Sequence, residues 1–187
     1  YWDPRDTTQT PEPEGIIDVL DITDPAGDLK SIVRIRVAGA ILSRWQLDEK
    51  DGILRVVSQQ GAGRTGNGLN DPRVVTLKID AAQDGTTTFT PLGAMSLQMP
   101  KQEGLRSVRF DGNRAYAITY NQTDPLFIID LSDPAAPKQR GELFMPGFVY
   151  HMEPFGDRVL GIGIDRDDQE GSLNVSLFDV SNPDAPT

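Results

Sequence analysis

A short strand-and-turn phrase recurs along this chain, and it constrains the fold more than any other feature. In its clearest copy, at 124–134 (DPLFIIDLSDP), an apolar run ends at an aspartate and is followed within a few residues by Asp-Pro. Two further copies read VLDITDP at 19–25 and LFDVSNP at 177–183. A looser copy without the proline reads VTLKID at 75–80. Four related segments in one chain indicate an internal repeat.

The period of this repeat predicts units of several strands. With Asp21, Lys78, Asp130 and Asp179 taken as equivalent, the spacings are 57, 52 and 49 residues. Periods of about 40–50 residues with strands in each repeat are typical of propeller blades. A second mark, a turn rich in aspartate and glycine before an apolar strand, recurs in DEKDGILRVVS, RFDGNRAYAIT and EPFGDRVLGIG. The predicted fold is therefore all-β: a partial β-propeller of about three to four four-stranded antiparallel blades of a larger ring.

The repeats divide the chain into a lead-in and four units. Residues 1–14 are polar and rich in proline and threonine, so we expect an extended linker there. The propeller segment is expected to cover 15–187, with blades at approximately 15–72, 73–123, 124–171 and the start of another at 172–187.

Turn signals set the expected strand boundaries. Asp24-Pro25-Ala26-Gly27 predicts a turn, and Asp51-Gly52 predicts a hairpin. Similar turns are expected at 83–85, 111–114 and 156–158, and helices are nearly absent from the prediction. The runs LFIID and VSLFD are apolar at successive positions, which predicts strands buried on both faces. In the first unit we expect four strands, at 16–23, 29–37, 40–47 and 53–58.

Composition excludes several classes of function. The formal net charge of −10 disfavours nucleic acid as a partner, because phosphate backbones are repelled. The absence of cysteine excludes disulfides, thiolate zinc sites and cysteine nucleophiles. No apolar stretch approaches the roughly 18 residues of a membrane span, and no signal peptide is visible. Since the sequence opens on Tyr1 rather than Met, we expect it to be a piece of a longer precursor.

The block at 105–186 closely resembles the secreted β-propeller family of bacteria and archaea, which is described as distantly related to WD-type repeats. The segments GNRAYAITYNQTDPLFIIDLSDPAAPKQRGELFMPGF, RVLGIG and VSLFDVSNPDAP carry the resemblance, which extends more weakly back to about Gly15. It implies a protein exported to the extracellular space, periplasm or cell envelope. It also implies that this sequence forms about three blades, which further blades of the same protein complete. The resemblance assigns no catalytic residues.

An acidic loop is the first candidate site. It contains four carboxylates in six residues, and hard cations such as calcium take six to eight oxygen ligands. The loop does not match the EF-hand pattern, so a solvated hairpin loop is the alternative. Whether calcium binds is left open by the sequence for Asp165, Asp167, Asp168 and Glu170.

The repeated aspartates are predicted to be structural. Asp21, Asp130 and Asp179 stand where a strand meets its turn, and their carboxylates are expected to accept hydrogen bonds from turn amides. Asp133 or Asn182 would cap the proline turn in the same way. Recurrence in successive units favours architecture over catalysis.

His151 is the only histidine in the sequence. A Ser-His-Asp arrangement would need Ser107 and an aspartate, and no G-x-S-x-G elbow is present. We interpret His151 as an ordinary polar residue near the start of a strand.

Two further features are weighed as binding elements. The glycine-rich loop at 61–68 lacks both phosphate-binding patterns and is predicted to be an inter-strand loop that could line a binding face. Aromatic side chains are predicted to fill gaps between blades, with Phe148 and Tyr150 as surface or channel candidates. The set comprises Trp45, Tyr116, Tyr120, Phe127, Phe144, Phe148, Tyr150 and Phe155.

These features assign no catalytic, cofactor-binding or metal-binding residue, and no cofactor is expected. The favoured hypothesis is a non-catalytic exported binding or scaffold module whose protein or cell-envelope partner is unidentified. One alternative is a metal-dependent hydrolase with a central-channel site shared with blades outside this segment. Another is a purely structural role in the cell envelope.

Overall fold

The computed structural model confirms the predicted all-β architecture. It describes residues 14–59, 71–82, 86–99, 103–120, 124–145, 148–165 and 171–187. Within these, thirteen strands and one short 3-10 helix are present. The elements are β1 (Glu14–Asp21), β2 (Lys30–Ala38), η1 (Arg44–Gln46), β3 (Leu47–Lys50), β4 (Ile53–Ser58), β5 (Arg73–Ala81), β6 (Thr87–Ser96), β7 (Gly104–Asp111), β8 (Arg114–Tyr120), β9 (Asp124–Asp130), β10 (Lys138–Met145), β11 (Phe148–Phe155), β12 (Arg158–Ile164) and β13 (Leu173–Asp179).

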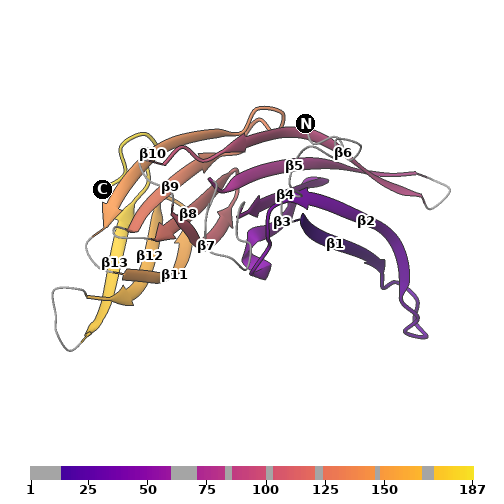
Figure 1. Ribbon diagram of the computed structural model, residues 1–187, viewed down its shortest axis with the longest axis horizontal. Coiled ribbons are helices and arrows are strands. Elements are labelled where there is room, and N and C mark those ends of the chain that lie inside the picture. Colours follow the sequence, from indigo (N-terminus) through magenta and orange to yellow (C-terminus); the bar gives the residue numbers. More distant parts are fainter. Residues whose placement is uncertain are drawn as a thin grey trace, which may run out of the picture.

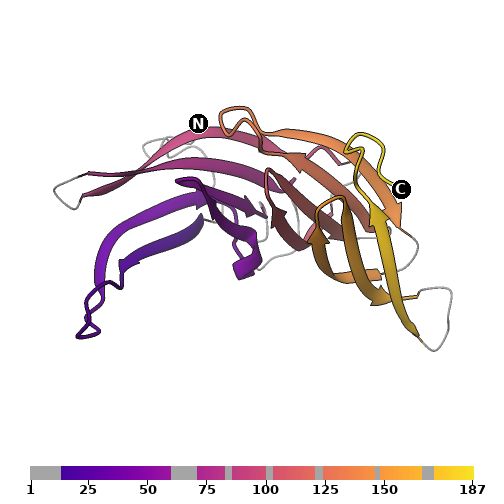
Figure 2. The same cartoon turned by 180° about the vertical axis from the view of Figure 1, so that it is seen from behind.

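The strands form four antiparallel sheets that follow one another along an arc (Figure 1, and from behind in Figure 2). Sheet 1 is β1–β2, sheet 2 is β3–β6, sheet 3 is β7–β10 and sheet 4 is β11–β13. Within each sheet, strands that are consecutive in sequence pair with one another, as in a propeller blade. The fourth strands of the complete sheets, β6 and β10, lie on the convex side of the arc (Figure 1).

The sheets are out of phase with the sequence repeat. β9 is the third strand of sheet 3, and the copies of its phrase fall on β13 and β1. In sheet 3, Asp130 pairs with Lys138 at the start of the next strand. The equivalent residues after β13, Asp179 and Thr187, exchange backbone hydrogen bonds of 2.7 and 3.0 Å. The ranges 73–123 and 124–171 therefore each join the last two strands of one sheet to the first two of the next. The four ranges stay a prediction of where the repeat units begin and end. The boundaries of the sheets lie at other positions in the sequence.

The strand predicted at 40–47 is wrong: Ala40 forms only an isolated bridge with Gln59, a 3-10 helix occupies Arg44–Gln46, and the next strand begins at Leu47. Ser43 and Gln46 form a capping box, in which the Gln46 side chain accepts the backbone N–H groups of Leu42 (2.7 Å) and Ser43 (2.9 Å). The Ser43 hydroxyl accepts the Trp45 backbone N–H at 3.3 Å. The following strand, β3, joins β4 in sheet 2, so the first four expected strands do not form one sheet.

The predicted turns are confirmed where they are described. Asp51 and Gly52 have φ of 53° and 76°, the positive values that a tight two-residue hairpin requires. Gly112 and Gly156 also have positive φ, 55° and 64°, in the turns after β7 and β11. The turn predicted at 83–85 lies outside the described residues.

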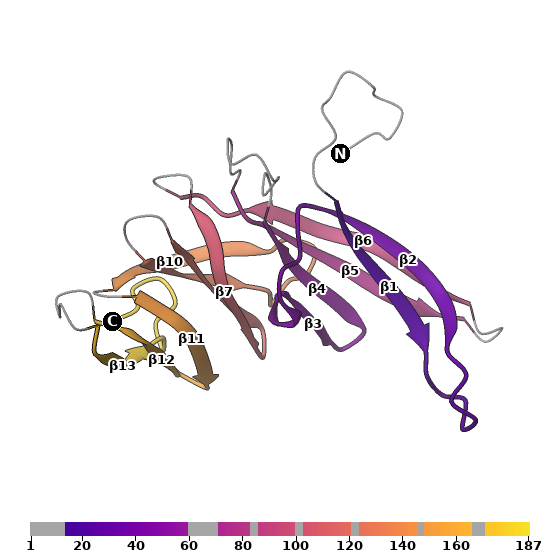
Figure 3. The same cartoon turned by 60° about the horizontal axis from the view of Figure 1, so that its bottom comes forward.

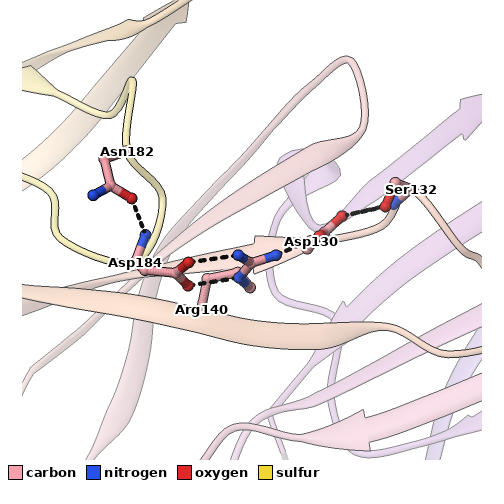
Figure 4. Close-up of polar contacts among 5 residues, drawn as sticks. All are labelled: Asp130, Ser132, Arg140, Asn182 and Asp184. Carbon is pink, nitrogen blue, oxygen red and sulfur yellow. Dashed lines mark hydrogen bonds and ion pairs between the residues drawn. The ribbon is translucent and has the colours of Figure 1, made fainter.

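The repeated aspartates cap their turns as predicted. Asp130 Oδ1 accepts the backbone N–H of Ser132 at 2.9 Å and its hydroxyl at 2.6 Å (Figure 4). Asp179 makes the same pair of contacts with Ser181, at 2.9 and 2.6 Å. Asp21 repeats them with Thr23, at 2.9 and 2.7 Å. The second acidic or amide residue of each turn caps the amide two residues later, as the pairs Asp133–Ala135, Asn182–Asp184 and Asp24–Ala26 show.

Apolar cores fill the spaces between successive sheets. β9 has full burial from Leu126 to Ile129, because its alternate side chains enter the cores on either side of sheet 3. The same double burial predicted for VSLFD is wrong. Val175 and Leu177 are 59% and 58% exposed, since among the described residues no sheet covers that face of sheet 4.

The turns after β9 and β13 each dock on the fourth strand of the preceding sheet. A Cβ atom on Gly93 of β6 would lie 2.6 Å from the Pro134 carbonyl oxygen, and one on Gly141 of β10 would lie 2.7 Å from that of Pro183. Only glycine allows this approach without displacing backbone. The Gly141 N–H donates to the Pro183 oxygen at 2.7 Å. We call this arrangement the blade joint: the proline turn of one sheet seated on a glycine of the sheet before it.

Arg140 adds an ionic contact to the joint between sheets 3 and 4. Its guanidinium binds Asp184 through two hydrogen bonds of 2.7 and 2.6 Å and Asp130 through one of 3.0 Å (Figure 4). Asp184 belongs to the turn after β13, whereas Asp130 ends β9 in the same sheet as Arg140. One arginine therefore connects the turn of its own sheet to the turn of the next.

Acid should weaken this joint. The Arg140 contact lowers the pKa of Asp184, and the Ser132 contacts followed by Arg140 lower the pKa of Asp130, both from about 3.8. A lowered pKa in the folded state contributes stability that is present above the unfolded value and is lost as the pH falls through the folded value. We therefore expect the free energy of unfolding, measured in urea, to fall as the pH drops below about 4.

Arg140→Met should reduce this acid dependence, because Asp184 loses its partner and Asp130 loses one of its partners. Arg73→Met is the matched control, since Arg73 has no ion pair among the described residues. An unchanged acid dependence in Arg140→Met would contradict the role given to this arginine.

Candidate functional site

The first strands of three successive sheets meet on the concave side of the arc. Figure 3 brings this side forward, and β11, β7 and β3 follow one another there. β7 packs against β11 on one side and against η1 on the other. A cleft of about 500 Å³ opens between them. It is lined by Arg44, Trp45, Leu47, Asp48, Arg109, Phe110, Glu153 and Pro154.

Trp45 is placed in this cleft by η1. The capping box holds the turn, and the buried Gln46 donates to the Val57 carbonyl at 2.8 Å, which fixes η1 to sheet 2. The Trp45 side chain remains 43% exposed. Its ring lies 4.3 Å from the Arg44 guanidinium and 4.2 Å from that of Arg109. The result is an accessible indole flanked by two cations.

Arg109 of β7 is the most buried charged side chain that lines the cleft. It is 7% exposed, and its Nη1 donates to the Val108 carbonyl at 2.7 Å. Its Nη2 lies 3.1 Å from His151 Nδ1, while its Nε is buried without a hydrogen-bond partner in the described part of the chain. Burial lowers the pKa of Arg109, as does Arg44, whereas Glu153 acts to raise it.

Asp48 is already neutralised by Arg55. The Arg55 guanidinium pairs with the Asp48 carboxylate, donates to the Gly112 carbonyl at 2.6 Å and lies 5.1 Å from the Phe110 ring. Because Gly112 belongs to sheet 3, this arginine also joins two sheets. Arg114 repeats the role one sheet later by donating to the Val180 carbonyl at 2.9 Å.

His151 contacts Arg109 and Glu153 rather than a catalytic set. Its Nε2 lies 3.7 Å from Glu153 Oε2, and its Nδ1 faces Arg109 as described above. Ser107 is buried on β7 and shares no hydrogen bond with His151 in the described structure. Ser107 and His151 therefore do not form part of a Ser-His-Asp arrangement in the described structure.

The aromatic prediction is confirmed in part. Tyr116 and Phe127 are fully buried between sheets. Tyr150, a predicted surface candidate, is 44% exposed. The side chains of Tyr120 and Phe148 lie outside the described set. The prediction of gap filling is wrong for Trp45, Phe144 and Phe155, which are exposed.

Two loops singled out in the sequence are not described. The glycine-rich loop at 61–68 lies outside the described residues, as do Asp167, Asp168 and Glu170 of the acidic loop. Asp165 is described, and its backbone N–H donates to the Ser172 carbonyl at 2.9 Å. Calcium binding at this loop stays a prediction.

The described ranges contain neither a metal-binding cluster nor a membrane-spanning helix. No group of three or more histidine, aspartate or glutamate side chains is arranged there to hold a metal ion. No helix in those ranges is long and apolar enough to cross a bilayer.

Sequence reasoning missed the cleft, although one signal for it is visible. Ser43-Arg44-Trp45-Gln46 has the S-x-x-Q spacing of a capping box, which would have predicted a helical turn presenting Trp45. Arg109 has no such signal, because an arginine in an alternating strand is normally assigned to the solvent face.

Comparisons with known proteins agree with the architecture. A family model described as a β-propeller domain matches residues 2–187. An uncharacterized protein of Methanocaldococcus jannaschii is 36% identical over 151 residues, 81% of this chain and 22% of that protein. An uncharacterized protein of Archaeoglobus fulgidus is 34% identical over 151 residues, 80% of this chain and 21% of that protein. The chain therefore spans about a fifth of the length of these curated relatives.

Proposed function

The chain belongs to the β-propeller domain family, and we propose that it is a non-catalytic binding or scaffold module that engages its ligand on the concave face. The cleft at Trp45 and Arg109 carries this proposal. It combines an accessible aromatic ring with cations and lies where three sheets converge, the kind of concavity in which ligands are usually bound. The repeated aspartates, by contrast, are used in capping turns.

The proposed setting is outside the cytoplasm, with an unidentified protein or cell-envelope partner. The resemblance to secreted, distantly WD-like propellers supports it. Fractionation of cells that produce the intact protein tests this setting: recovery in the extracellular or envelope fraction is expected, and recovery in the cytoplasm would contradict it.

A metal-dependent hydrolase is the second candidate. His151 and Glu153 lie together on β11, next to the cleft, and are the described groups that other blades would have to complement. A metal at such a site would supply Lewis acidity to a bound carbonyl or water.

Activity assays separate the two candidates. The intact protein is screened against ester, lactone and glycoside substrates, with added divalent metal and with a chelator. A binding module is expected to give no turnover above the rate without protein. Turnover that the chelator abolishes would establish the hydrolase and overturn the binding proposal.

We further propose that additional blades of the same protein cover the two ends of the arc. At the sheet 1 end Ile22 is 75% exposed, whereas its equivalents after β9 and β13, Leu131 and Val180, are 4% and 0% exposed because the preceding sheet covers them. At the sheet 4 end Leu177 is 58% exposed, whereas its equivalent Ile128 is fully buried. Within the described residues, the sheet 1 end therefore presents a proline turn with no preceding sheet to seat on, and the sheet 4 end presents an uncovered apolar face. The greater length of the relatives leaves room for further blades at both ends.

Cysteine labelling tests this arrangement, because the printed sequence contains no cysteine. In the intact native protein, Ile22→Cys and Leu177→Cys should react with a maleimide at least about tenfold more slowly than the exposed control Glu142→Cys. All three should react equally in denaturant. Native rates equal to that of the control would contradict the proposal. So would protection that disappears on dilution, which would identify a second copy as the covering partner.

A further inference from the structure

We propose that the cleft at Arg109 and Trp45 binds a single carboxylate group carried on a small apolar or aromatic ligand. This inference rests on the proposed function, since it specifies what the concave face binds. It uses Arg109 of β7 in sheet 3 and the pair Arg44 and Trp45 of the 3-10 helix η1.

Arg109 carries a buried charge that no described ion pair compensates. An arginine that is 7% exposed is normally paired with a carboxylate, because an isolated buried charge is costly. Among the described residues, Arg109 forms no ion pair: it contacts the Val108 carbonyl, the His151 ring and the Trp45 indole, and Glu153 acts on it without a direct contact. A second cation, Arg44, lines the same cleft. An anion bound here would lie beside both cations.

The Arg109 guanidinium also has hydrogen-bonding capacity that is not used. The buried Nε–H of Arg109 has no acceptor, and Nη2 is engaged only by His151 at 3.1 Å. Nε and Nη2 share one edge of the guanidinium, and a carboxylate can bind that edge through two parallel hydrogen bonds. His151 is 40% exposed, so the ring has room to turn aside as the carboxylate arrives.

Charge balance limits the ligand to one negative charge. Arg44 and Arg109 contribute two positive charges to the lining, and Glu153 contributes one negative charge. Asp48 is offset by Arg55. With these groups ionised, the local balance is one positive charge, which matches a monocarboxylate better than a phosphate dianion.

The remaining lining residues indicate that the rest of the ligand is apolar. Trp45, Leu47, Phe110 and Pro154 provide apolar surface beside the two arginines. A flat ring or short aliphatic chain would contact the exposed Trp45 indole while its carboxylate reaches Arg109. The volume of about 500 Å³ suits a small molecule or the end of a chain.

Titration with benzoate tests the proposal in the full chain. Trp2→Phe leaves Trp45 as the single tryptophan of the printed sequence, and a signal that is absent from the double variant Trp2→Phe/Trp45→Phe reports on the cleft. Benzoate should change the Trp45 emission saturably at constant ionic strength. Benzamide, which has the same ring without the charge, should bind roughly 10- to 100-fold more weakly, as expected for the loss of a charged hydrogen bond. Inorganic phosphate should also bind more weakly than benzoate.

Variants locate the effect at Arg109. Arg109→Met should weaken benzoate binding roughly 10- to 100-fold. Arg109→Lys should give an intermediate loss, because the charge is kept and the two-point edge is removed. Arg73→Met, on β5 outside the lining, should bind as the wild type does. If Arg109→Met fails to fold, as circular dichroism would show, the comparison of benzoate with benzamide in the unsubstituted protein decides.

Three results would overturn the carboxylate site: no saturable response to benzoate, equal binding of benzamide, or tighter binding of phosphate. None of them bears on turnover in the activity screen. A failed titration with no turnover therefore removes the carboxylate assignment and leaves the binding module standing. Turnover in the screen removes the binding module whatever the titration shows.

Discussion

The structure depends on the contact between a proline turn and a glycine of the preceding sheet. At Gly93 and Gly141 the absence of a side chain lets the carbonyl of Pro134 or Pro183 approach the backbone. The capping aspartates hold the turn in shape, and Arg55 and Arg114 add contacts from second strands to the next sheet. Apolar cores supply the bulk of the burial between sheets, but they are not directional. The joint therefore sets how sheet 3 is placed on sheet 2 and how sheet 4 is placed on sheet 3.

The same joint brings the candidate site together. The innermost strands of successive sheets converge on the concave side, and the lining of the cleft comes from three sheets. Arg109 is buried because β7 lies between η1 and β11. No single blade could form this site. If the joints were disturbed, the cleft would be lost along with the packing of the sheets.

The sequence predicted the fold through features that act locally, and the site eluded it because its causes are not local. Asp130 and Asp179 could be assigned to turn capping because each bonds residues two positions away. The phase of the sheets could not be predicted, since a repeat looks the same wherever counting begins. The apolar pattern at Val175 and Leu177 predicts burial, yet both are exposed. Burial depends on a neighbouring sheet whose position the sequence does not reveal. Arg109 is buried by contacts with η1 and β11, distant in sequence.

The central claim, that the proline turns specify how the sheets stack, is tested most directly by adding one methyl group. Gly93→Ala and Gly141→Ala place a Cβ atom 2.6 and 2.7 Å from turn carbonyl oxygens, and backbone on both sides limits relaxation. Each variant should lose about 1–3 kcal/mol of unfolding free energy in urea denaturation, the usual cost of overpacking. Wild-type stability in both variants would show that the turns are not held against these glycines, and would contradict the account.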